Sequence, residues 1–274
     1  MTSRTYYISS GRDVPSEEKC LSICLQANGF SFSVVSTSGA WLSFGEVYIG
    51  PTPTMTEAVQ LIRNRLAEGG VVPVGYHSME LVVLSRYFVM VPDALYEPGN
   101  DRQYLKPLAQ LSLGTGVYSH HHETLGAQVV FAGDNTLVSA FKIALPGVKV
   151  MCQFSKMIGE QLIQRSATHP CMLLHVREGA VDVAVASEGA LVFANSFDQH
   201  ETSEVLFTAI NVMKQLHVEG ATLETMVCGD VDRARFAEMR RYFPQLTLYC
   251  GKEVQVLTAE MAHLPAYKHA LILS

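Results

Sequence analysis

The pattern of apolar and polar positions predicts one three-stranded unit that occurs twice along the chain. In the first copy, apolar runs at residues 21–25, 30–35 and 41–49 are separated by turns at Ala27-Asn28-Gly29 and residues 36–39. In the second copy, the runs at residues 172–176, 180–186 and 190–197 are separated by turns at Arg177-Glu178-Gly179 and residues 187–189. Short apolar runs bounded by Gly, Asn and Ser are typical of strands joined by hairpin turns. The chain therefore reads as two similar halves.

A helix and a further strand are expected after each unit. Thr54 and Glu57 form a Thr-x-x-Glu capping box ahead of apolar residues at helical spacing, and Gly69-Gly70 ends that helix. In the second half, Asp198 and Glu201 offer a weaker box ahead of an apolar helical stripe. The strands that follow the helices include residues 81–84 and 223–227.

The segment between the two copies has a different order. A strand at residues 87–91 is ended by Pro92, and a helix over residues 100–113 is interrupted by Pro107. The expected elements that follow are one or two edge strands within residues 117–131, a helix at 137–145, a strand at 148–154 and a helix at 155–167. At the end of the chain, residues 271–273 read equally as a last strand or an apolar docking tail.

Several segments together carry a family resemblance. They are residues 21–23 leading to 28–32, residues 91–96 with Tyr104-Leu105, Asn195-Ser196-Phe197 with Thr202, residues 211–216, and Cys228-Gly229-Asp230. In order and spacing they resemble an uncharacterised bacterial family, the domain-of-unknown-function family 3822, over nearly the whole chain from about Lys19 onward. The family has the fold of the actin-like ATPases and no assigned activity.

The resemblance implies an α/β protein of two ribonuclease-H-like domains, the actin-like ATPase (ASKHA) fold with a central cleft. The first domain is expected at residues 1–168, with an inserted segment at about 100–135, and the second at residues 169–274. In this fold the first hairpin turn of each domain faces the cleft.

The resemblance also places the nucleotide site. In active members of the superfamily each hairpin turn carries Asp-x-Gly, whose glycine lets backbone N–H groups approach phosphates and whose aspartate holds Mg²⁺. Alignment on glycine puts Ala27 and Arg177 at the two aspartate positions, and a shift of one residue brings Gln26 or Glu178 there. The adenosine-side turn is normally Gly-Gly and is here Cys228-Gly229-Asp230. The candidate cofactor-binding positions are Asn28, Gly29, Arg177, Glu178, Gly179, Gly229 and Asp230.

Neither turn contains an aspartate, so we assign no catalytic residue, no metal ligand and no cofactor, with ATP and Mg²⁺ kept as the alternative. His120-His121-His122 is the obvious metal candidate, but adjacent side chains point to different sides, and a polar surface loop is the expected setting. His175 lies in an apolar run and is expected to be a core histidine with a hydrogen-bond partner.

Composition excludes several classes of function. The net charge is −6 and only 17% of residues are charged, which argues against binding to nucleic-acid phosphates. No apolar run approaches the roughly 20 residues that a helix needs to cross a bilayer. No secretory signal is recognised before Lys19, and the six cysteines form no Cys-x-x-Cys pair. We therefore expect a cytoplasmic protein with reduced thiols.

These observations favour a non-catalytic interaction or scaffold protein with an actin-like fold. Its partner is expected to be a protein of unknown identity, and self-association stays open. One alternative is a nucleotide-binding sensor without hydrolysis. The other is an active ATPase or small-molecule kinase that uses Glu178, Asp230 and an unusual metal arrangement.

Overall fold

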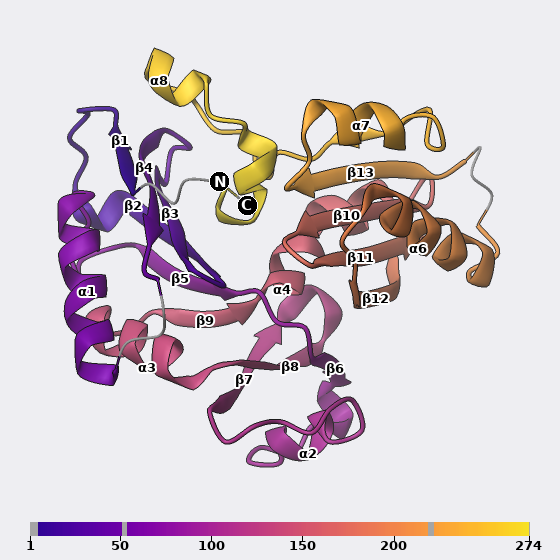
Figure 1. Cartoon of the computed structure of the whole chain (residues 1–274), viewed down its shortest axis with the longest axis horizontal. Helices are drawn as coiled ribbons and strands as arrows, with labels where there is room; N and C mark the ends of the chain where they lie inside the picture. Colours follow the sequence, from indigo (N-terminus) through magenta and orange to yellow (C-terminus); the bar gives the residue numbers. More distant parts are fainter. Residues whose placement is uncertain (1–4, 51–53, 219–221, 274) are drawn as a thin grey trace. The chain divides into compact units, whose positions relative to one another are not determined.

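The computed structural model describes residues 5–50, 54–218 and 222–273, and the chain divides into two compact units (Figure 1). The first unit comprises Met1–Gln153, Lys252–Pro265 and Leu271–Leu273, and the second comprises Phe154–Gly251 and Ala266–Ala270. The predicted domain boundary at residue 168 stays a prediction. Among the described residues no helix is both long enough and apolar enough to cross a membrane.

A six-stranded sheet forms the centre of the first unit, in the order β1-β4-β3-β2-β5-β9. Its strands are β1 (Tyr6–Ser9), β2 (Lys19–Gln26), β3 (Gly29–Ser36), β4 (Trp41–Tyr48), β5 (Ser78–Val83) and β9 (Lys149–Cys152). Strands β2, β3 and β4 are antiparallel neighbours, whereas β5 pairs parallel with β2 and β9 parallel with β5. The first predicted three-stranded unit is confirmed.

Helices α1 (Met55–Glu68) and α3 (Asn135–Ala144) pack against one another in this unit (Figure 1). The capping box of α1 is confirmed, because the Thr54 hydroxyl accepts the Glu57 N–H at 3.4 Å and the Glu57 carboxylate accepts the Thr54 N–H at 2.9 Å. Each bond satisfies a backbone donor that the first turn of a helix leaves unpaired.

A three-stranded antiparallel sheet, β6-β8-β7, completes the first unit. Its strands are β6 (Phe88–Pro92), β7 (Thr115–His122) and β8 (Ala127–Asp134). The helix predicted over residues 100–113 is wrong in length, since α2 covers only Asp101–Leu105. Pro107, two residues further on, has no N–H with which to continue a helix.

The second unit repeats the strand order of the first, apart from β1, which has no counterpart. Its five-stranded sheet runs β12-β11-β10-β13-β14, with β10, β11 and β12 antiparallel and β13 and β14 parallel to β10. The strands are β10 (Cys171–Arg177), β11 (Ala180–Ser187), β12 (Ala190–Asp198), β13 (Glu224–Gly229) and β14 (Thr247–Leu248). The second three-stranded unit is therefore confirmed as well.

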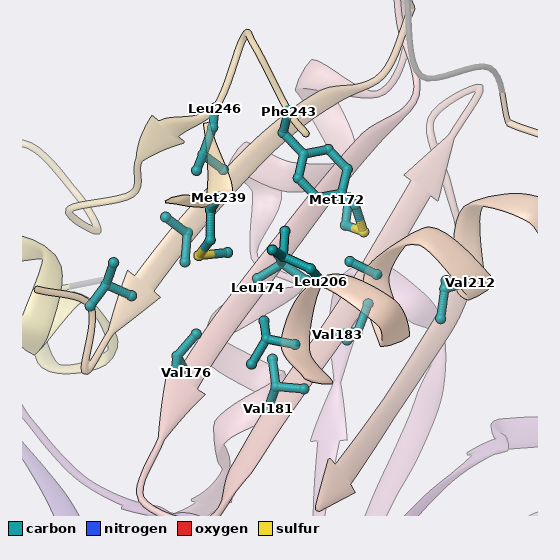
Figure 2. Close-up of a cluster of buried hydrophobic side chains, with 14 of the residues drawn as sticks. Met172, Leu174, Val176, Val181, Val183, Leu206, Val212, Met239, Phe243 and Leu246 are labelled. Atoms are coloured by element: carbon teal, nitrogen blue, oxygen red, sulfur yellow. The ribbon is translucent and has the colours of Figure 1, made fainter. Parts of the chain in front are cut away.

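Helices α6 (Thr202–Gln215) and α7 (Arg233–Met239) cover one face of this sheet. Figure 2 shows side chains of β10 and β11 gathered with side chains of both helices and of the segment after α7, among them Met172, Leu174, Val183, Leu206, Met239 and Phe243. Side chains alternate between faces along a strand, so the remaining positions of β10 and β11 point to the opposite face.

Three predicted boundaries are wrong. The box at Asp198 and Glu201 is displaced, because β12 continues to Asp198 and Glu201 itself caps α6 with Glu204. The helix expected over residues 155–167 is two helices, α4 (Gln153–Met157) and α5 (Glu160–Arg165), with Gly159 as the N-cap of the second. β9 ends at Cys152 instead of continuing to residue 154, and the next side chain, Gln153, bonds the Ser85 backbone at 2.8 and 2.6 Å.

The end of the chain is neither a strand nor a free docking tail. After α8 (Ala259–Ala262), Ala266–Ile272 forms 3-10 turns, with further short 3-10 segments at Ser16–Glu18, Asp93–Leu95 and Glu123–Leu125. Leu271, Ile272 and Leu273 are buried. Burial of these apolar side chains stabilises the segment and makes residues 271–273 unavailable for docking.

The turn between β11 and β12 stores backbone strain. Glu188 adopts a φ of 54° and Gly189 a φ of 75° between the paired residues Ser187 and Ala190. A two-residue hairpin with positive φ at both positions favours Asn-Gly, because a residue with a bulkier side chain clashes with its own backbone there.

We expect Glu188→Asn to raise the free energy of unfolding by about 1 kcal/mol, since asparagine tolerates the left-handed region. Urea unfolding followed by circular dichroism measures this difference. Glu188→Ala is the matched control: it removes the same charge, keeps the strain and is expected to give no gain. Equal stabilisation by both variants would show that charge, and not backbone conformation, is responsible.

Candidate functional site

The most unusual feature of the second unit is a carboxylate inside its sheet. Asp182 lies on β11, on the face opposite α6 and α7, and its side chain is 0% exposed. The Nδ1 atom of His175 lies 2.9 Å from its Oδ2 atom. Arg177 donates from Nε to Oδ2 at 3.0 Å and from Nη2 to Oδ1 at 3.1 Å. Both oxygens of the buried carboxylate are therefore paired.

The register of the hairpin brings these three residues together. Arg177 pairs with Ala180 across a two-residue turn, so His175 stands directly opposite Asp182. Burial alone would raise the pKa of Asp182, but the hydrogen bond from His175 and the charge of Arg177 outweigh it and lower the pKa below its ordinary value. Asp182 is therefore ionised, and Arg177 is the nearby full positive charge that compensates it.

A further bond holds the Arg177 guanidinium at the end of the sheet. Its Nη2 atom donates to the Ser196 hydroxyl at 2.8 Å, and the Ser196 N–H donates to Oδ1 of Asn195 at 2.9 Å. Arg177 stands where the resemblance puts a metal-holding aspartate, yet it binds inward to Asp182 and Ser196. Sequence reasoning missed Asp182, although a lone aspartate in an apolar strand requires a buried partner.

In the first hairpin turn, Asn28 and Gly29 are in direct contact with the backbone at the end of strand β4 and just beyond it. The Asn28 carbonyl oxygen accepts the N–H groups of Ile49 at 2.9 Å and Gly50 at 3.3 Å. A Cβ atom on Gly29 would collide with the carbonyl oxygen of Val47 on β4. Packing of β3 against β4 is therefore sufficient reason for glycine at this position.

Local packing also explains the glycine at position 229. Its φ is 88°, and a Cβ atom there would collide with the carbonyl oxygen of Val176 on the neighbouring strand β10. That carbonyl accepts the Asp230 N–H at 2.7 Å, and the Asp230 carboxylate lies 3.6 Å from Nζ of Lys268. The close approach of β13 and β10 explains the glycine without a ligand.

The predicted positions of the second half meet at one cavity of about 230 Å³. It lies where β10 and β13 end and α6 and α7 begin, and it is lined by Val176, Arg177, Glu178, Gly179, Gln199, His200, Glu201, Val205, Asp230 and Arg235. Arg177, Glu178, Gly179 and Asp230 are thus brought together, with Gly229 adjacent in the chain, whereas Asn28 and Gly29 belong to the first unit. Pockets for drug-sized ligands usually begin at about 300 Å³, so this one suits a smaller group.

The N-terminus of α6, which borders the cavity, is capped by carboxylates. Glu204 accepts the N–H groups of His200 at 2.7 Å and Glu201 at 3.2 Å, and these backbone bonds lower the pKa of its carboxyl group. The Glu201 side chain accepts the Glu204 N–H in return. Two negative charges therefore stand where a phosphate would use the positive end of a helix.

Arg235, the second arginine at the cavity, is also held by protein acceptors. It donates from Nη1 to the Asp230 carbonyl at 2.7 Å and from Nε to the Thr202 hydroxyl at 3.3 Å. Phosphate binding by arginine relies on paired donors aimed at the ligand. At this cavity Nε and Nη1 of Arg235, like Nε and Nη2 of Arg177, donate to protein acceptors instead.

The histidine run lies on strand β7 and not on a surface loop, which corrects the expectation from sequence. His121 lies 2.9 Å from the Asp93 carboxylate, and burial together with neighbouring His122 lowers the pKa of His120. In the part of the chain that the structure describes, no three His, Cys, Asp or Glu side chains are grouped to hold a metal ion.

Cys228 on β13 stands beside His175 in the sheet, an arrangement that suggests a thiol nucleophile. Burial, with a smaller contribution from the nearby charge of Asp182, raises the pKa of this thiol. A protonated, buried thiol is a poor nucleophile, so nucleophilic chemistry is not supported here. His175 is confirmed as a buried histidine with a partner, Asp182.

Removal of the central carboxylate should strongly destabilise the second unit. Asp182→Ala leaves Arg177 and His175 without their buried partner, and we expect a loss of about 3–5 kcal/mol at neutral pH. The pKa of Asp182 is lowered on folding, so its contribution is present above about pH 4 and is lost as the pH falls further. Urea unfolding across a pH series should therefore show the gap between wild type and variant narrowing in acid.

Asp13→Ala is the control, because the Asp13 side chain is fully exposed and its ion pair with Lys19 is long, at 4.0 Å. It should change stability by less than about 0.5 kcal/mol. An Asp182→Ala protein as stable as wild type at neutral pH would contradict the role given to this carboxylate.

Comparison with known proteins identifies the family and the fold. The family described as "Protein of unknown function (DUF3822)" matches residues 13–246. No curated protein sequence matches the chain. A Bacteroides thetaiotaomicron protein with actin-like ATPase fold and unknown function is 21% identical, with a TM-score of 0.69 over 85% of this chain and 91% of that one.

Two further solved structures are similar at lower identity. The ethanolamine utilization protein EutJ from Carboxydothermus hydrogenoformans is 11% identical, with a TM-score of 0.50 over 97% of this chain and 92% of that one. A chain of the PilM–PilN type IV pilus biogenesis complex is 11% identical, with a TM-score of 0.52 over 94% and 97% of the two chains. These likenesses show the fold alone. The chain belongs to the DUF3822 family of proteins of unknown function and has an actin-like ATPase fold.

Proposed function

We propose that this protein binds protein partners through an actin-like fold that does not hydrolyse ATP. The observation that carries the proposal is Arg177. It stands at a position where active relatives of this fold use a metal-holding aspartate, and its guanidinium is bonded to buried Asp182 and to Ser196. A fixed positive charge there opposes Mg²⁺ instead of coordinating it.

The energetic consequence is large for phosphoryl transfer. Mg²⁺ prefers carboxylate oxygens, and it neutralises the charge that develops between the phosphates in the transition state. Loss of that metal removes several kcal/mol of transition-state stabilisation. Arg177 is a poor replacement at the phosphates, because its Nε and Nη2 atoms donate to Asp182 and Ser196.

The glycines of the three turns give no independent support for phosphate binding. Gly29 and Gly229 are each required by a neighbouring backbone carbonyl, that of Val47 or Val176. Gly179 is explained by its φ of 72° in the hairpin turn. The N-terminus of α6 is capped by Glu201 and Glu204. In this chain, packing and helix capping therefore explain the features that bind phosphate in active proteins of this fold.

Binding of a protein partner is supported by analogy at the level of the fold. One similar structure is a PilM–PilN complex, in which a protein of this fold is bound to another protein of type IV pilus biogenesis. The low charge content of this chain, 17%, is consistent with a surface that contacts other proteins. One fold can carry many unrelated functions, so this analogy is weaker support than the chemistry of Arg177.

A second candidate function rests on the carboxylates of the cavity. Glu178 and Asp230 both line it, and two carboxylates are the minimum from which an unusual metal arrangement would be built. With them the protein would be an ATPase or kinase. Nucleotide binding without turnover would make it a sensor.

Calorimetric titration with ATP, ADP and Mg²⁺, paired with a phosphate-release assay, separates the three functions. We expect neither binding heat nor phosphate release, because no aspartate is available at either hairpin turn. Binding without release would instead favour the sensor. Affinity capture from the native cell, followed by titration of the purified partner, tests the interaction half of the proposal.

Sustained turnover that Glu178→Ala abolishes would overturn the proposal in favour of an enzyme. Glu188→Ala is the matched control, since it removes a glutamate from the other hairpin turn of the same unit. Turnover that both variants retain would point to a contaminating ATPase.

A further inference from the structure

Helix α7 carries a concentration of positive charge in a chain that is acidic as a whole. Arg233, Arg235, Arg240 and Arg241 fall within nine consecutive residues of a protein whose net charge is −6. Arg235 lines the cavity and donates to the Asp230 carbonyl, whereas the other three side chains are exposed. These three, Arg233, Arg240 and Arg241, are called the α7 arginines below.

Helix geometry places the α7 arginines on one side. Met239 and Phe243 pack into the core of the second unit (Figure 2), so the opposite side of the helix faces solvent. The N–H groups of Arg240 and Arg241 bond to carbonyls four and three residues back, which extends the helical spacing past Met239. On this spacing the α7 arginines fall within about 100° of one another, and Arg233 and Arg241 are about 12 Å apart along the axis.

The protein leaves most of this charge uncompensated. Within the residues that the structure describes, the side chains of Arg233 and Arg241 form no ion pair and no hydrogen bond. Arg240 donates from Nη2 to the Pro244 carbonyl at 3.4 Å, a neutral acceptor. Glu238 is exposed on the same helix, yet it pairs with none of the described cations. Three like charges therefore stand close together without a carboxylate between them.

Arg233 also stands at the unfavourable end of its helix. It is the first residue of α7, where the partial positive charge of the helix N-terminus repels a cation. The adjacent carboxylate of Asp232 offsets part of this repulsion, although its Oδ1 atom accepts the Arg235 N–H as the N-cap. Residues that break a local rule without compensation are expected at functional positions.

We propose that the α7 arginines bind an acidic segment of a partner protein, whose carboxylates pair with the guanidinium groups. The inference rests on the proposed function, because it names the surface that holds the protein partner. Charge complementarity carries it: arginine pairs with a carboxylate through two parallel hydrogen bonds, and the donors of this face are open. The side chains between the arginines, Ala234 and Ala237, are small and exposed, so the segment can approach the helix closely.

A protein segment fits this face better than nucleic acid does. Tight binding to a phosphate backbone typically uses about six to ten cationic contacts, and the face offers three in a chain of net charge −6. The distance of about 12 Å from Arg233 to Arg241 matches about four residues of an extended segment. Two or three carboxylates on such a segment are enough to reach all of the α7 arginines.

Titration of the full chain with a hexaglutamate peptide measures the proposed contact. Wild type should bind the peptide at low ionic strength, and the affinity should fall as salt is added, because exposed charge pairs are screened. Arg233→Ala/Arg241→Ala should weaken binding about fivefold or more, since it removes two of the three cations. Neither side chain bonds to the described part of the protein, so the variant should remain folded, which thermal unfolding checks.

Arg12→Ala/Lys252→Ala is the matched control, because it removes two exposed cations elsewhere in the chain and should leave the affinity for hexaglutamate unchanged. Wild type that does not bind the peptide would overturn the inference. An equal response of both double variants would overturn it too, since net charge and not the α7 face would then be responsible. Tighter binding of a duplex DNA oligonucleotide than of hexaglutamate would replace the protein partner by nucleic acid.

The same variants separate this inference from the proposed function. A purified partner that binds wild type and Arg233→Ala/Arg241→Ala equally well would overturn the role of the α7 arginines and leave the proposed function in place. Phosphate release from ATP would instead overturn the proposed function, whereas the affinity for hexaglutamate does not depend on it.

Discussion

A fully buried carboxylate has to be compensated where it lies, and in this protein the residues that compensate Asp182 decide what its hairpin turn can do. The negative charge inside the β10–β11 sheet is paired with His175 and with two donors of Arg177. Breaking such a pair costs more than the pair contributes, because the remaining charge stays buried. Arg177 is therefore fixed at the end of β10, and the position to which the resemblance assigns a metal-holding aspartate presents a cation engaged with the protein.

Much of the fold follows from sequence because local signals and packing agree. The two three-stranded units are correct since apolar runs, turn residues and hairpin lengths all indicate the same pairing. The Thr54 capping box is correct for the same reason. The failures occur where tertiary structure overrides local pattern: β12 extends to Asp198 through pairing with β11, and the C-terminal residues bury as 3-10 turns against their own chain. No local pattern records those contacts.

Only part of the candidate site could be predicted from the sequence. Alignment on Gly179 located Arg177, but its inward bond to Asp182 depends on strand register, which sets His175 directly opposite Asp182 and Arg177 diagonally across from it. A lone aspartate within an apolar strand was the available signal. The reverse error is instructive as well: Gly229 matches a nucleotide-site glycine, yet the close approach of the Val176 carbonyl accounts for it. A glycine that matches a motif and a glycine required by packing cannot be told apart until the neighbouring strand is known.

The most direct test of the central claim is crystallographic. A crystal grown or soaked with Mn²⁺ and a non-hydrolysable ATP analogue reveals any bound cation by its anomalous scattering. Our account predicts that Arg177 stays bonded to Asp182 and that no anomalous peak lies at either hairpin turn. A Mn²⁺ ion bound at those turns, with Arg177 swung away from Asp182 and Glu178 or Asp230 among its ligands, would contradict it.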